Sequence, residues 1–553
     1  MSSKIVIIGG VAGGASVAAR LRRMDEQAQI ILIEKGPYIS YANCGLPYYI
    51  GETITQREKL FVQSVAGFAQ RFRVDIRTLS EAVEIVPEQK LVRVRESVSG
   101  NIYEESYDKL VLSPGALPIV PEWPGIQSEG VFTLRDVQDT DNIKRYIREK
   151  AVESAAIIGG GFIGLEMAEN LCMAGLEVSL IEKQPQVMAS LDPEMANFIH
   201  QKLYDNGVGL YLGKGVSGIG RQGENLRISL ESGENLEVSM VLLCMGVRPN
   251  TELARAAGLR IGDTGGIAVN AYMQTSDPAI YALGDAVEIP HRLLQKPVLL
   301  PLAGPANKEA RIVADNIVLG NLHTYNGCIG TSIAKVFDLH VASVGLNEKQ
   351  LQKEGLPYAA SHTHSPSHAS YYPQSKMMDI KLLFHPENGK LWGAQAVGSQ
   401  GVDKRIEMIA QVLRHHGDIS DLCETEQAYA PPFASAKDPV NMAGFVAENI
   451  CSGRCRIVQW QDVLHRDREK TLLLDVRTPL EYAEGHLPEA VNMEVDRLRE
   501  QLQDLPKDKD IIIYCAIGLR GYVASRILMQ HGFTRVYNLS GGFRTYQMAV
   551  KTF

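Results

Sequence analysis

The sequence predicts an α/β protein made of several domains, and three observations support this prediction. The chain has 553 residues, which is too many for one hydrophobic core, because domains average roughly 150 residues. Near residues 5 and 155, a short apolar run leads into a glycine-rich turn and then a helical segment. Short apolar runs alternate with helical segments again at the end of the chain. We therefore expect two strand–turn–helix units and a small C-terminal α/β domain, with an α+β domain between them.

Composition and charge exclude several classes of protein. Hydrophobic residues make up 45% of the chain and charged residues 22%, which is typical of a folded globular protein. The formal net charge of -8 provides no overall basic field to attract nucleic acid or anionic lipid. No uncharged stretch approaches the roughly 20 residues that span a bilayer, and eight scattered cysteines indicate a reducing compartment. We expect a cytoplasmic protein with no nucleic-acid partner, no membrane segment and no metal centre.

Each strand–turn–helix unit has a second strand after its helix. The predicted strands are Ile5–Ile8 and Ile30–Ile33 in the first unit, and Ala155–Ile158 and Val178–Ile181 in the second. In a dinucleotide-binding turn, the first glycine permits the tight bend and the second lets the backbone approach pyrophosphate. The third lets the helix pack on the strand. The two units are therefore expected to be Rossmann-like nucleotide-binding domains.

The second turn has the full glycine spacing, with Gly159, Gly161 and Gly164. Glu182 lies 18 residues after Gly164, at the end of the next strand, where a carboxylate accepts from an adenosine ribose hydroxyl. A 2'-phosphate at that place would be repelled, so the sequence favours NADH over NADPH. The adjacent Lys183 keeps that preference moderate.

The first turn departs from this spacing. Gly9 and Gly14 keep the outer positions, but Val11 occupies the middle one, so the motif alone is a weak signal. Glu34, 20 residues after Gly14, supplies the matching acid. Because two such units with matching acids occur in one chain, we expect a second nucleotide at this turn.

Two further segments indicate that one domain is discontinuous. Leu110–Pro118 is an apolar run followed by glycine and prolines, and Val241–Pro249 repeats the pattern. The chain is expected to leave and re-enter one domain at these points. Alternating apolar segments over 325–449 predict the α+β domain, and Cys451–Arg456 is the expected linker. Its two cysteines are expected to be unrelated thiols, with a redox pair as the alternative.

Thr275–Ala286 reads Thr-Ser-Asp-Pro-Ala-Ile-Tyr-Ala-Leu-Gly-Asp-Ala. It resembles the segment with which the FAD-dependent pyridine nucleotide-disulfide oxidoreductases place a Gly-Asp pair on the ribityl and phosphate of the flavin. The resemblance implies that Asp285 contacts FAD; an N-cap for the next helix is the alternative. The implied FAD site comprises Gly9, Gly10, Ala12, Gly14, Glu34, Lys35, Gly115 and Asp285.

A single redox cysteine stands in Ser40–Gly51, which reads Ser-Tyr-Ala-Asn-Cys-Gly-Leu-Pro-Tyr-Tyr-Ile-Gly. Two-cysteine flavoprotein reductases have a second cysteine five residues after the first, where this chain has Tyr49. We expect the Cys44 thiolate to attack a sulfur substrate and to be freed by electrons from NADH through FAD. The segment resembles that of the coenzyme A-disulfide reductases, including rhodanese fusions that reduce coenzyme A persulfide and polysulfide. A buried structural cysteine is the alternative.

Two other chemistries share this fold. Single-cysteine NADH peroxidases and NADH oxidases pass through a cysteine sulfenic acid, and they have a histidine where this chain has Ala12. The resemblance therefore favours a thiol substrate. In the coenzyme A reductases, two tyrosines of the partner subunit approach the cysteine to assist a departing thiolate. Tyr371 and Tyr429 resemble them, with Tyr372 as the alternative to Tyr371, which implies a homodimer.

Coenzyme A carries phosphates, which need cations. Arg20 and Arg23 lie three residues apart on the first predicted helix and share one face. The resemblance assigns basic residues here to the adenosine phosphates; an ordinary solvated helix face is the alternative. The implied substrate site comprises Arg20, Arg23, Ser40, Asn43, Arg71 and Arg73.

The end of the chain has a reactive cysteine of its own. Ile511–Cys515 is a predicted strand, Cys515–Arg520 is a six-residue loop, and a helix is expected from Gly521. Backbone N–H groups and a helix N-terminus at such a turn stabilise a thiolate or a persulfide. The segment resembles a single-domain rhodanese, which implies that Cys515 carries sulfane sulfur and that Arg520 favours an anionic donor. A non-catalytic rhodanese-like module is the alternative.

These resemblances imply domain limits and a function. The expected domains are an FAD-binding domain at 1–118 and 249–324, an NAD(P)H-binding domain at 119–248, a dimerisation domain at 325–449 and a rhodanese domain at 457–553. We expect NADH-dependent reduction of coenzyme A persulfide, polysulfide or coenzyme A disulfide at Cys44, with coenzyme A as substrate or bound ligand. A sulfane sulfur donor would load the rhodanese domain, which favours a persulfide substrate. The alternatives are sulfurtransferase as the main activity, an NADH oxidase or peroxidase, and a redox-sensing or docking module.

Overall fold

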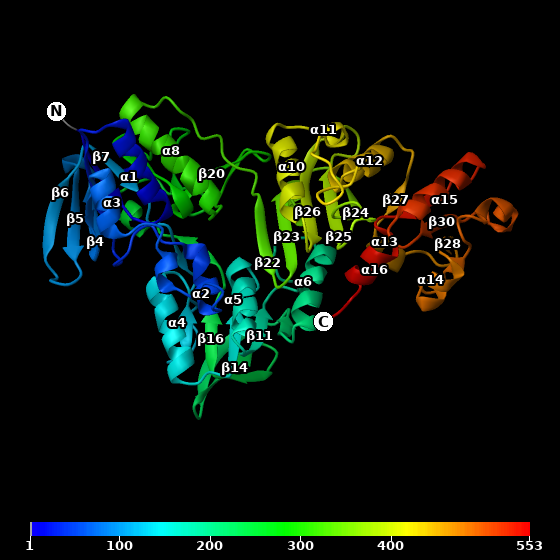
Figure 1. The fold of residues 1–553 in the computed structure, drawn as a ribbon, viewed down its shortest axis with the longest axis horizontal. Helices are drawn as coiled ribbons and strands as arrows, with labels where there is room; N and C mark the ends of the chain where they lie inside the picture. The colour runs from blue at the N-terminus through cyan, green and yellow to red at the C-terminus, as the bar shows by residue number, and fades with distance from the viewer. Residues whose placement is uncertain (1–2) are drawn as a thin grey trace. The chain divides into compact units, whose positions relative to one another are not determined.

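A computed structural model of the chain describes residues 3–553, which form two compact units (Figure 1). The first unit contains the described residues through Lys183 together with Tyr211–Cys328. The second contains Gln184–Leu210 and Ile329–Phe553. No helix in the described part of the chain is long and apolar enough to cross a membrane.

The first unit contains a five-stranded parallel sheet in the order β19-β7-β1-β2-β3. Its strands are β1 (Lys4–Ile8), β2 (Gln29–Ile33), β3 (Asp75–Arg77), β7 (Lys109–Leu112) and β19 (Ile280–Ala282). Helices α1 (Ala12–Met24) and α8 (Ala303–Leu319) pack against each other beside it. Because chain connections diverge on the two sides of β1, a nucleotide is expected at the carboxyl ends of the strands there.

A second parallel sheet follows the order β12-β11-β10-β16-β9. Its strands are β9 (Val131–Thr133), β10 (Ser154–Ile158), β11 (Glu177–Glu182), β12 (Gly209–Leu212) and β16 (Met240–Leu243). Helix α5 (Phe162–Met173) follows the glycine turn after β10. Strands β8 (Ala116–Pro118) and β17 (Val247–Pro249) pair antiparallel, so the two segments expected to connect the domains lie side by side.

Smaller elements complete the first unit. Two antiparallel sheets are formed by β4 (Ser80–Val86), β5 (Leu91–Glu96) and β6 (Ile102–Ser106), and by β13 (Val216–Gln222), β14 (Asn225–Leu230) and β15 (Asn235–Val238). A third contains β18 (Ile267–Ala268), β20 (Val287–His291) and β21 (Lys296–Val298). The remaining helices are α2 (Leu46–Ile50), α3 (Val65–Phe72), α4 (Val137–Glu149) and α7 (Glu252–Ala256).

The second unit begins with an antiparallel sheet in the order β22-β23-β26-β25-β24. Its strands are β22 (Ser332–Val336), β23 (Leu339–Gly345), β24 (Ala359–Pro366), β25 (Met377–Phe384) and β26 (Leu391–Gly398). Its helices are α9 (Glu348–Glu354), α10 (Val402–Arg414), α11 (Ile419–Glu424) and α12 (Pro439–Cys451). Helix α6 (Pro193–Asp205) contacts this sheet and groups with this unit, although it follows the second nucleotide-type motif in the chain.

A parallel sheet in the order β27-β31-β30-β28-β29 ends the chain. Its strands are β27 (Ile457–Val458), β28 (Thr471–Asp475), β29 (Val491–Asn492), β30 (Asp510–Tyr514) and β31 (Val536–Leu539). Its helices are α13 (Trp460–Leu464), α14 (Pro479–Glu484), α15 (Leu519–Gln530) and α16 (Gly542–Ala549). The predicted start of α15 at Gly521 is wrong. The helix begins at Leu519, because Gly518 adopts a left-handed backbone with φ of 102° and starts the turn earlier.

Candidate functional site

The first glycine-rich turn is closed by Glu34. Its two carboxylate oxygens accept from the backbone N–H groups of Gly10 and Gly36, each at 2.7 Å. A Cβ at Gly9 would lie 2.1 Å from the carbonyl oxygen of Ser113, and the backbone of Gly9 has a φ of 94°. The turn therefore requires glycine there, and burial raises the pKa of Glu34. This tight, carboxylate-held turn fits the adenosine end of a dinucleotide.

The second turn repeats this construction around Glu182. The Glu182 carboxylate accepts from Gly160 N–H at 2.7 Å, and a Cβ at Gly164 would lie 2.0 Å from the Gly159 carbonyl oxygen. At Gly161, by contrast, a Cβ would meet nothing within 4 Å. The middle glycine therefore faces open space, as the approach of a pyrophosphate needs. The ammonium of Lys183 pairs with Glu231 at 3.2 Å.

Asp285 lies in a short turn, Gly284–Ala286, between β19 and β20. The next helix, α8, begins at Ala303 with Leu302 at its N-cap, so the alternative of Asp285 as an N-cap is wrong. Burial raises the pKa of Asp285. Glu309 of α8, which the sequence did not single out, accepts from Gly284 N–H at 2.8 Å, and burial raises its pKa to about 7.

Three other residues expected at the flavin site, Gly115, Lys35 and Ala12, differ in their contacts and exposure. Gly115 has a φ of 69°, and a Cβ there would lie 3.0 Å from the Arg135 guanidinium. Lys35 is directed into an ion pair with Glu81 at 2.8 Å. Ala12 is the exposed first residue of α1. The turn Gly9–Gly14 with Glu34 and Asp285 is called the first cradle, and the turn Gly159–Gly164 with Glu182 the second. Lys35 pairs instead with Glu81.

Cys44 lies on a single-turn helix, Asn43–Gly45, that leads into α2. Its side chain is exposed, and all eight cysteines of the chain are free thiols. Desolvation by the surrounding protein raises the pKa of Cys44, and the carboxylates of Glu166 and Asp285 raise it further. Burial and these two carboxylates therefore disfavour the thiolate form of Cys44.

Glu166 on α5 is a second acidic residue that sequence reasoning missed. Burial, followed by repulsion from Glu169, raises its pKa to about 7, while a hydrogen bond with Tyr48 opposes the shift. A carboxyl group with this pKa carries a proton part of the time at neutral pH. Since Glu166 raises the pKa of Cys44, this group that can donate a proton lies near the thiol.

Tyr371 and Tyr429 are brought together by the fold of the second unit. Their hydroxyl groups lie 3.0 Å apart, although the residues are 58 positions apart in the chain. The hydrogen bond raises the pKa of Tyr371. Both are exposed, at 75% for Tyr371 and 50% for Tyr429, so the pair is available to a neighbouring molecule. Tyr372 instead packs edge-on against His368, with ring centroids 5.8 Å apart, which favours Tyr371 as the partner of Tyr429.

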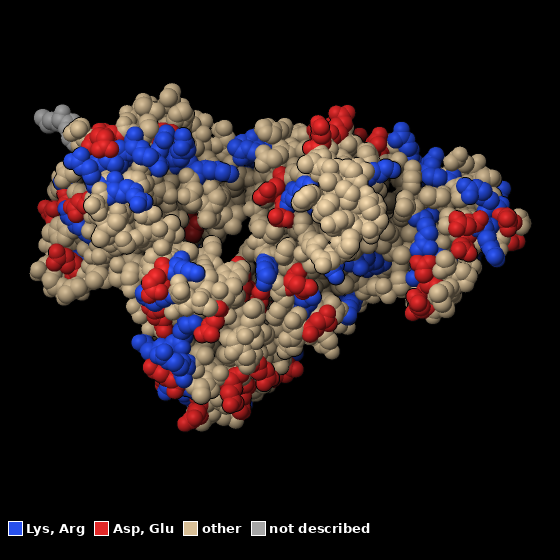
Figure 2. All heavy atoms as spheres, viewed as in Figure 1, with Lys and Arg blue, Asp and Glu red and all other residues tan. Residues whose placement is uncertain are grey.

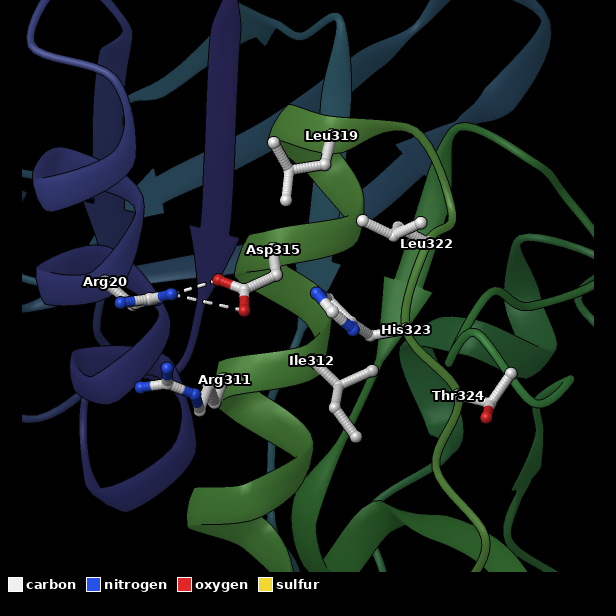
Figure 3. A pocket seen from close by; sticks show the side chains of 8 residues that line it. All are labelled: Arg20, Arg311, Ile312, Asp315, Leu319, Leu322, His323 and Thr324. Carbon is white, nitrogen blue, oxygen red and sulfur yellow. Dashed lines mark hydrogen bonds and ion pairs between the residues drawn. The ribbon is translucent and has the colours of Figure 1, made fainter.

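The arginines of the expected substrate site differ in their contacts. The Arg20 guanidinium forms two hydrogen bonds with Asp315 of α8, at 2.7 and 3.2 Å (Figure 3). Arg23 and Arg71 are exposed, and Arg73 pairs with Glu26 at 3.7 Å. Figure 2 shows basic side chains gathered over α1 and α8. Part of this charge is offset, because Arg20 already has a carboxylate partner.

A cavity of about 570 Å³ opens between α1 and the end of α8 (Figure 3). It is lined by Arg20, Arg311, Ile312, Asp315, Leu319, Leu322, His323 and Thr324. Its size lies within the range of sites for small ligands and cofactors. Ser40 lies apart from this lining: its N–H donates to the Gly10 carbonyl at 2.9 Å, and Asn43 is exposed beside Cys44.

Cys515 lies at the end of β30 and is 1% exposed. Gly518 N–H donates to its sulfur at 3.1 Å, which is the contact expected for a loop that holds a thiolate or persulfide. Arg520 forms two hydrogen bonds with Glu481, at 2.7 and 2.6 Å. Its interaction with Cys515 contributes to the raised pKa of Arg520, after the larger effect of Glu481. Asp475 and Arg477 pair with each other at 2.6 Å, consistent with a supporting role.

The linker cysteines have separate surroundings. Cys451 is the last residue of α12, and its thiol faces the His385 carbonyl at 3.8 Å. Cys455 is buried, and its thiol faces the Arg456 carbonyl at 3.8 Å. Burial raises the pKa of both thiols, which disfavours reactivity.

Comparison with known families identifies the class of protein. Residues 3–304 match the pyridine nucleotide-disulphide oxidoreductases, and 331–439 match the dimerisation domain of the same class. The chain therefore belongs to the pyridine nucleotide-disulphide oxidoreductase family. Residues 461–549 match the rhodanese-like domain, so the particular member is a fusion of the two. The predicted family and fold class are confirmed.

Individual relatives cover at least 80% of the chain. A coenzyme A disulfide reductase of Staphylococcus aureus is 34% identical over 445 residues, which is 80% of this chain and 100% of the relative. The crystal structure of reduced Bacillus anthracis CoADR-RHD has a TM-score of 0.97 and 48% identity, and covers 100% of this chain and 98% of its own. The structure of an NAD-dependent persulfide reductase from A. fulgidus has a TM-score of 0.92 and 37% identity. It covers 98% of this chain and 99% of its own.

Proposed function

We propose that this chain is a flavoprotein that uses NADH to reduce coenzyme A persulfide or coenzyme A disulfide through Cys44. Its rhodanese domain handles sulfane sulfur through Cys515. One observation carries the first part: Cys44 is an exposed thiol close enough to Asp285 of the first cradle for the carboxylate to raise its pKa. The coenzyme A disulfide reductase and persulfide reductase relatives support the choice of substrate.

The two cradles fit two dinucleotides. Glu34, Asp285 and the glycine turn would hold FAD, and Glu182 with its glycine turn would hold NADH. When bound, these cofactors supply the two electrons that return Cys44 to its thiolate after each cycle. Lys183 is occupied by Glu231, so it does not favour a 2'-phosphate, and NADH is the expected donor.

Cys44 acts as the nucleophile. Its thiolate attacks the coenzyme A sulfur of a persulfide, forming a Cys44–coenzyme A disulfide as hydrosulfide leaves. Two electrons and one proton then release coenzyme A thiol and restore the thiolate. Glu166, with its pKa of about 7, can hold this proton close to Cys44.

A homodimer completes this site. The family match to a dimerisation domain supports the assembly, and the exposed Tyr371–Tyr429 pair is the part of that domain suited to donate hydrogen bonds to a leaving thiolate. We assign this pair to the Cys44 site of the partner subunit. The domain limits expected from the sequence and a cytoplasmic location complete the proposal.

The cavity beside α1 would take the phosphate-bearing end of coenzyme A. Arg311 and Arg20 line it, and Arg23 lies exposed on the same helix as Arg20. Ser40, Asn43, Arg71 and Arg73 are the further residues assigned to substrate. Asp315 holds Arg20 in place, so Arg20 would orient the phosphates with part of its charge already neutralised.

The test is to follow NADH oxidation and hydrosulfide release together, without oxygen, with coenzyme A persulfide as substrate. One NADH consumed per hydrosulfide released supports the reductase. Sulfur transfer from thiosulfate to cyanide that needs no NADH, with no persulfide reduction, would instead make sulfurtransferase the main activity. NADH consumption that requires oxygen or peroxide would favour the oxidase or peroxidase chemistry.

A further inference from the structure

Strand β24 carries two buried histidines, His362 and His364, whose spacing places both on one face of its sheet. Both contact the turn Ser540–Gly542 that joins β31 to α16. The N–H of His362 donates to Ser540 Oγ at 3.0 Å, and its Nδ1 lies 3.1 Å from the same oxygen. The Nε2 of His364 lies 3.0 Å from the Gly541 carbonyl oxygen. The segment that matches the dimerisation domain thus forms hydrogen bonds with one turn of the segment that matches the rhodanese-like domain.

That turn and the first residues of α16 also hold the loop of Cys515. Phe543 N–H donates to the Cys515 carbonyl at 2.8 Å, and Arg544 N–H donates to the Ala516 carbonyl at 3.0 Å. Gly542, with a φ of 62°, packs so closely that a Cβ there would lie 2.5 Å from the Cys515 carbonyl oxygen. With no space between turn and loop, a shift of the turn must move the backbone around Cys515.

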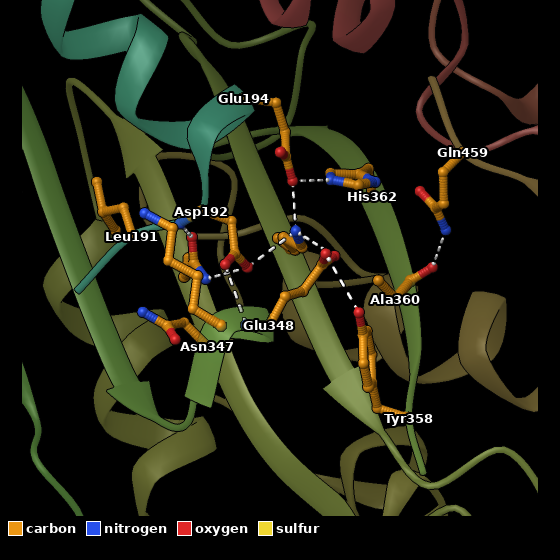
Figure 4. A network of polar contacts seen from close by, with 12 residues as sticks. Leu191, Asp192, Glu194, Asn347, Glu348, Tyr358, Ala360, His362 and Gln459 are labelled. Atoms are coloured by element: carbon orange, nitrogen blue, oxygen red, sulfur yellow. Dashed lines mark hydrogen bonds and ion pairs between the residues drawn. The ribbon is translucent and has the colours of Figure 1, made fainter. Parts of the chain in front are cut away.

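His362 is fixed from its other side by a buried charge network (Figure 4). Its Nε2 lies 3.0 Å from Glu194 of α6, and the same carboxylate pairs with Lys381 of β25. Lys381 also binds Asp192 at 2.9 Å and Glu348 at 2.7 Å. The ammonium group of Lys381 thus pairs with three carboxylates, including the one that contacts His362.

Burial lowers the pKa of His362, despite its bond to Glu194, which favours the neutral ring. A neutral ring that donates from Nε2 to Glu194 must accept at Nδ1, which Ser540 Oγ–H satisfies. The network thus selects the tautomer that binds the rhodanese turn.

His364 is held in a similar way. Its Nδ1 contacts Asp379 of β25, and its Nε2 reaches Thr545 Oγ1 at 2.9 Å as well as the Gly541 carbonyl. Arg544 of α16 binds Asp379 at 2.7 Å. Although burial opposes it, the hydrogen bonds from Arg544 and His364 lower the pKa of Asp379.

We propose that His362 and His364 are positioning residues for sulfur transfer at Cys515. They fix the Ser540–Gly542 turn, and the turn fixes the loop whose Gly518 N–H faces the Cys515 sulfur. The proposal rests on the proposed sulfurtransferase role of Cys515. Reactive groups need placement to within about 0.5 Å, so loosening the turn should slow transfer without removing any group that touches the donor.

Amide substitutions at the two histidines separate positioning from packing. Asparagine places its amide near Nδ1 of the replaced histidine, and glutamine reaches toward Nε2. His362 contacts the turn through Nδ1, so H362N should retain transfer better than H362Q. His364 contacts it through Nε2, so H364Q should retain transfer better than H364N. A packing role would give the same order at both positions.

The experiment uses the full-length protein loaded with FAD and measures thiosulfate-to-cyanide sulfur transfer. For H362Q and H364N we expect kcat to fall about tenfold with KM for thiosulfate unchanged. Reduction of preformed coenzyme A persulfide by NADH should be unchanged. Ser540→Ala should reproduce the loss seen in H362Q. The variant that combines H362Q with Ser540→Ala should lose no more activity than either substitution alone. Thr363→Val is the matched control, because Thr363 lies between the histidines on β24 and its hydroxyl donates to the Ile380 carbonyl of the same sheet.

Hydrogen exchange provides a readout that does not depend on activity. Amides of 515–520 and 540–545 should exchange faster in H362Q and H364N than in Thr363→Val. The same order of activity at both positions, or losses that follow the melting temperature, would overturn the positioning role. A wild-type chain that transfers no sulfur would contradict the proposed function of Cys515 itself, which is a different result.

Discussion

Cys44 is exposed on a short turn, whereas Cys515 is 1% exposed at the end of a central strand. The neighbours of Cys44 include Glu166 and Asp285, which raise its pKa, while Cys515 accepts a hydrogen bond from Gly518 N–H at 3.1 Å. On the proposed function, the first thiol needs cofactor, substrate and a second subunit to complete its surroundings. The second is completed by its own loop, so the two sites should respond differently to substitution.

The largest difference should follow removal of the first thiol. Cys44→Ser should lower NADH-dependent reduction of coenzyme A persulfide by about 10³-fold or more, because the nucleophile is lost. The variant should keep bound FAD, since the cradle is built from glycines and Glu34 elsewhere. Flavin absorbance and steady-state rates check both statements. Sulfur transfer at Cys515 is the internal control, and a loss there would mean that the two sites are not separate.

The arginines of α1 should distinguish the substrates of the two thiols. Arg20→Ala with Arg23→Ala should raise KM for coenzyme A persulfide about tenfold, because charge-assisted contacts to phosphate are lost. Reduction of inorganic polysulfide and sulfur transfer at Cys515 should change little. Equal losses with every substrate would show that the Arg20–Asp315 pair supports the fold and does not bind coenzyme A.

Glu166 should control the ionisation of Cys44. Its pKa is raised to about 7, so it becomes charged as pH rises through 7 and then opposes the thiolate. Glu166→Gln removes that charge, so the alkylation profile of Cys44 should move toward lower pH. Rates of alkylation from pH 6 to 10, followed by mass spectrometry, measure the shift. Glu177→Gln, at an exposed position of the same domain, should leave the profile in place.

Glu481 should set the preference of the second thiol among sulfur donors. Its carboxylate binds Arg520, which lowers the pKa of Glu481 to about 2 and keeps it charged at neutral pH. Glu481→Gln should free Arg520 for the anionic donor and lower KM for thiosulfate a few-fold. An increase in KM would show instead that the pair holds Arg520 in its working position.

Local patterns allowed much of the fold to be predicted. Strand, glycine turn and acid lie within a few dozen residues of one another, so both strand–turn–helix units could be predicted, although the first turn has Val11 in place of the middle glycine. The segment after Cys515 was predicted less well, because the left-handed Gly518 starts the helix two residues before the expected Gly521. The FAD contact implied for Asp285 stays a prediction, whereas the alternative of an N-cap is wrong, since strand β20 follows Asp285.

The parts that sequence reasoning missed depend on contacts between distant segments. Arg20 meets Asp315 across 295 positions, and His362 meets Ser540 across 178. Glu166 and Glu309 lie on helices whose sequences give no sign that an acid turns toward a cradle. Such pairings arise when distant segments pack together, and no local spacing in the sequence indicates which residues will meet.

The most direct test of two separate catalysts is Cys515→Ser with both activities measured on the same preparation. The variant should lose sulfur transfer from thiosulfate to cyanide, because the sulfur that faces Gly518 N–H and would carry the persulfide is gone. It should still reduce preformed coenzyme A persulfide with NADH at the wild-type rate, since Cys44, both cradles and the tyrosine pair are unchanged. Loss of the second activity together with the first would contradict the account and indicate an obligatory relay of sulfur from Cys515 to Cys44.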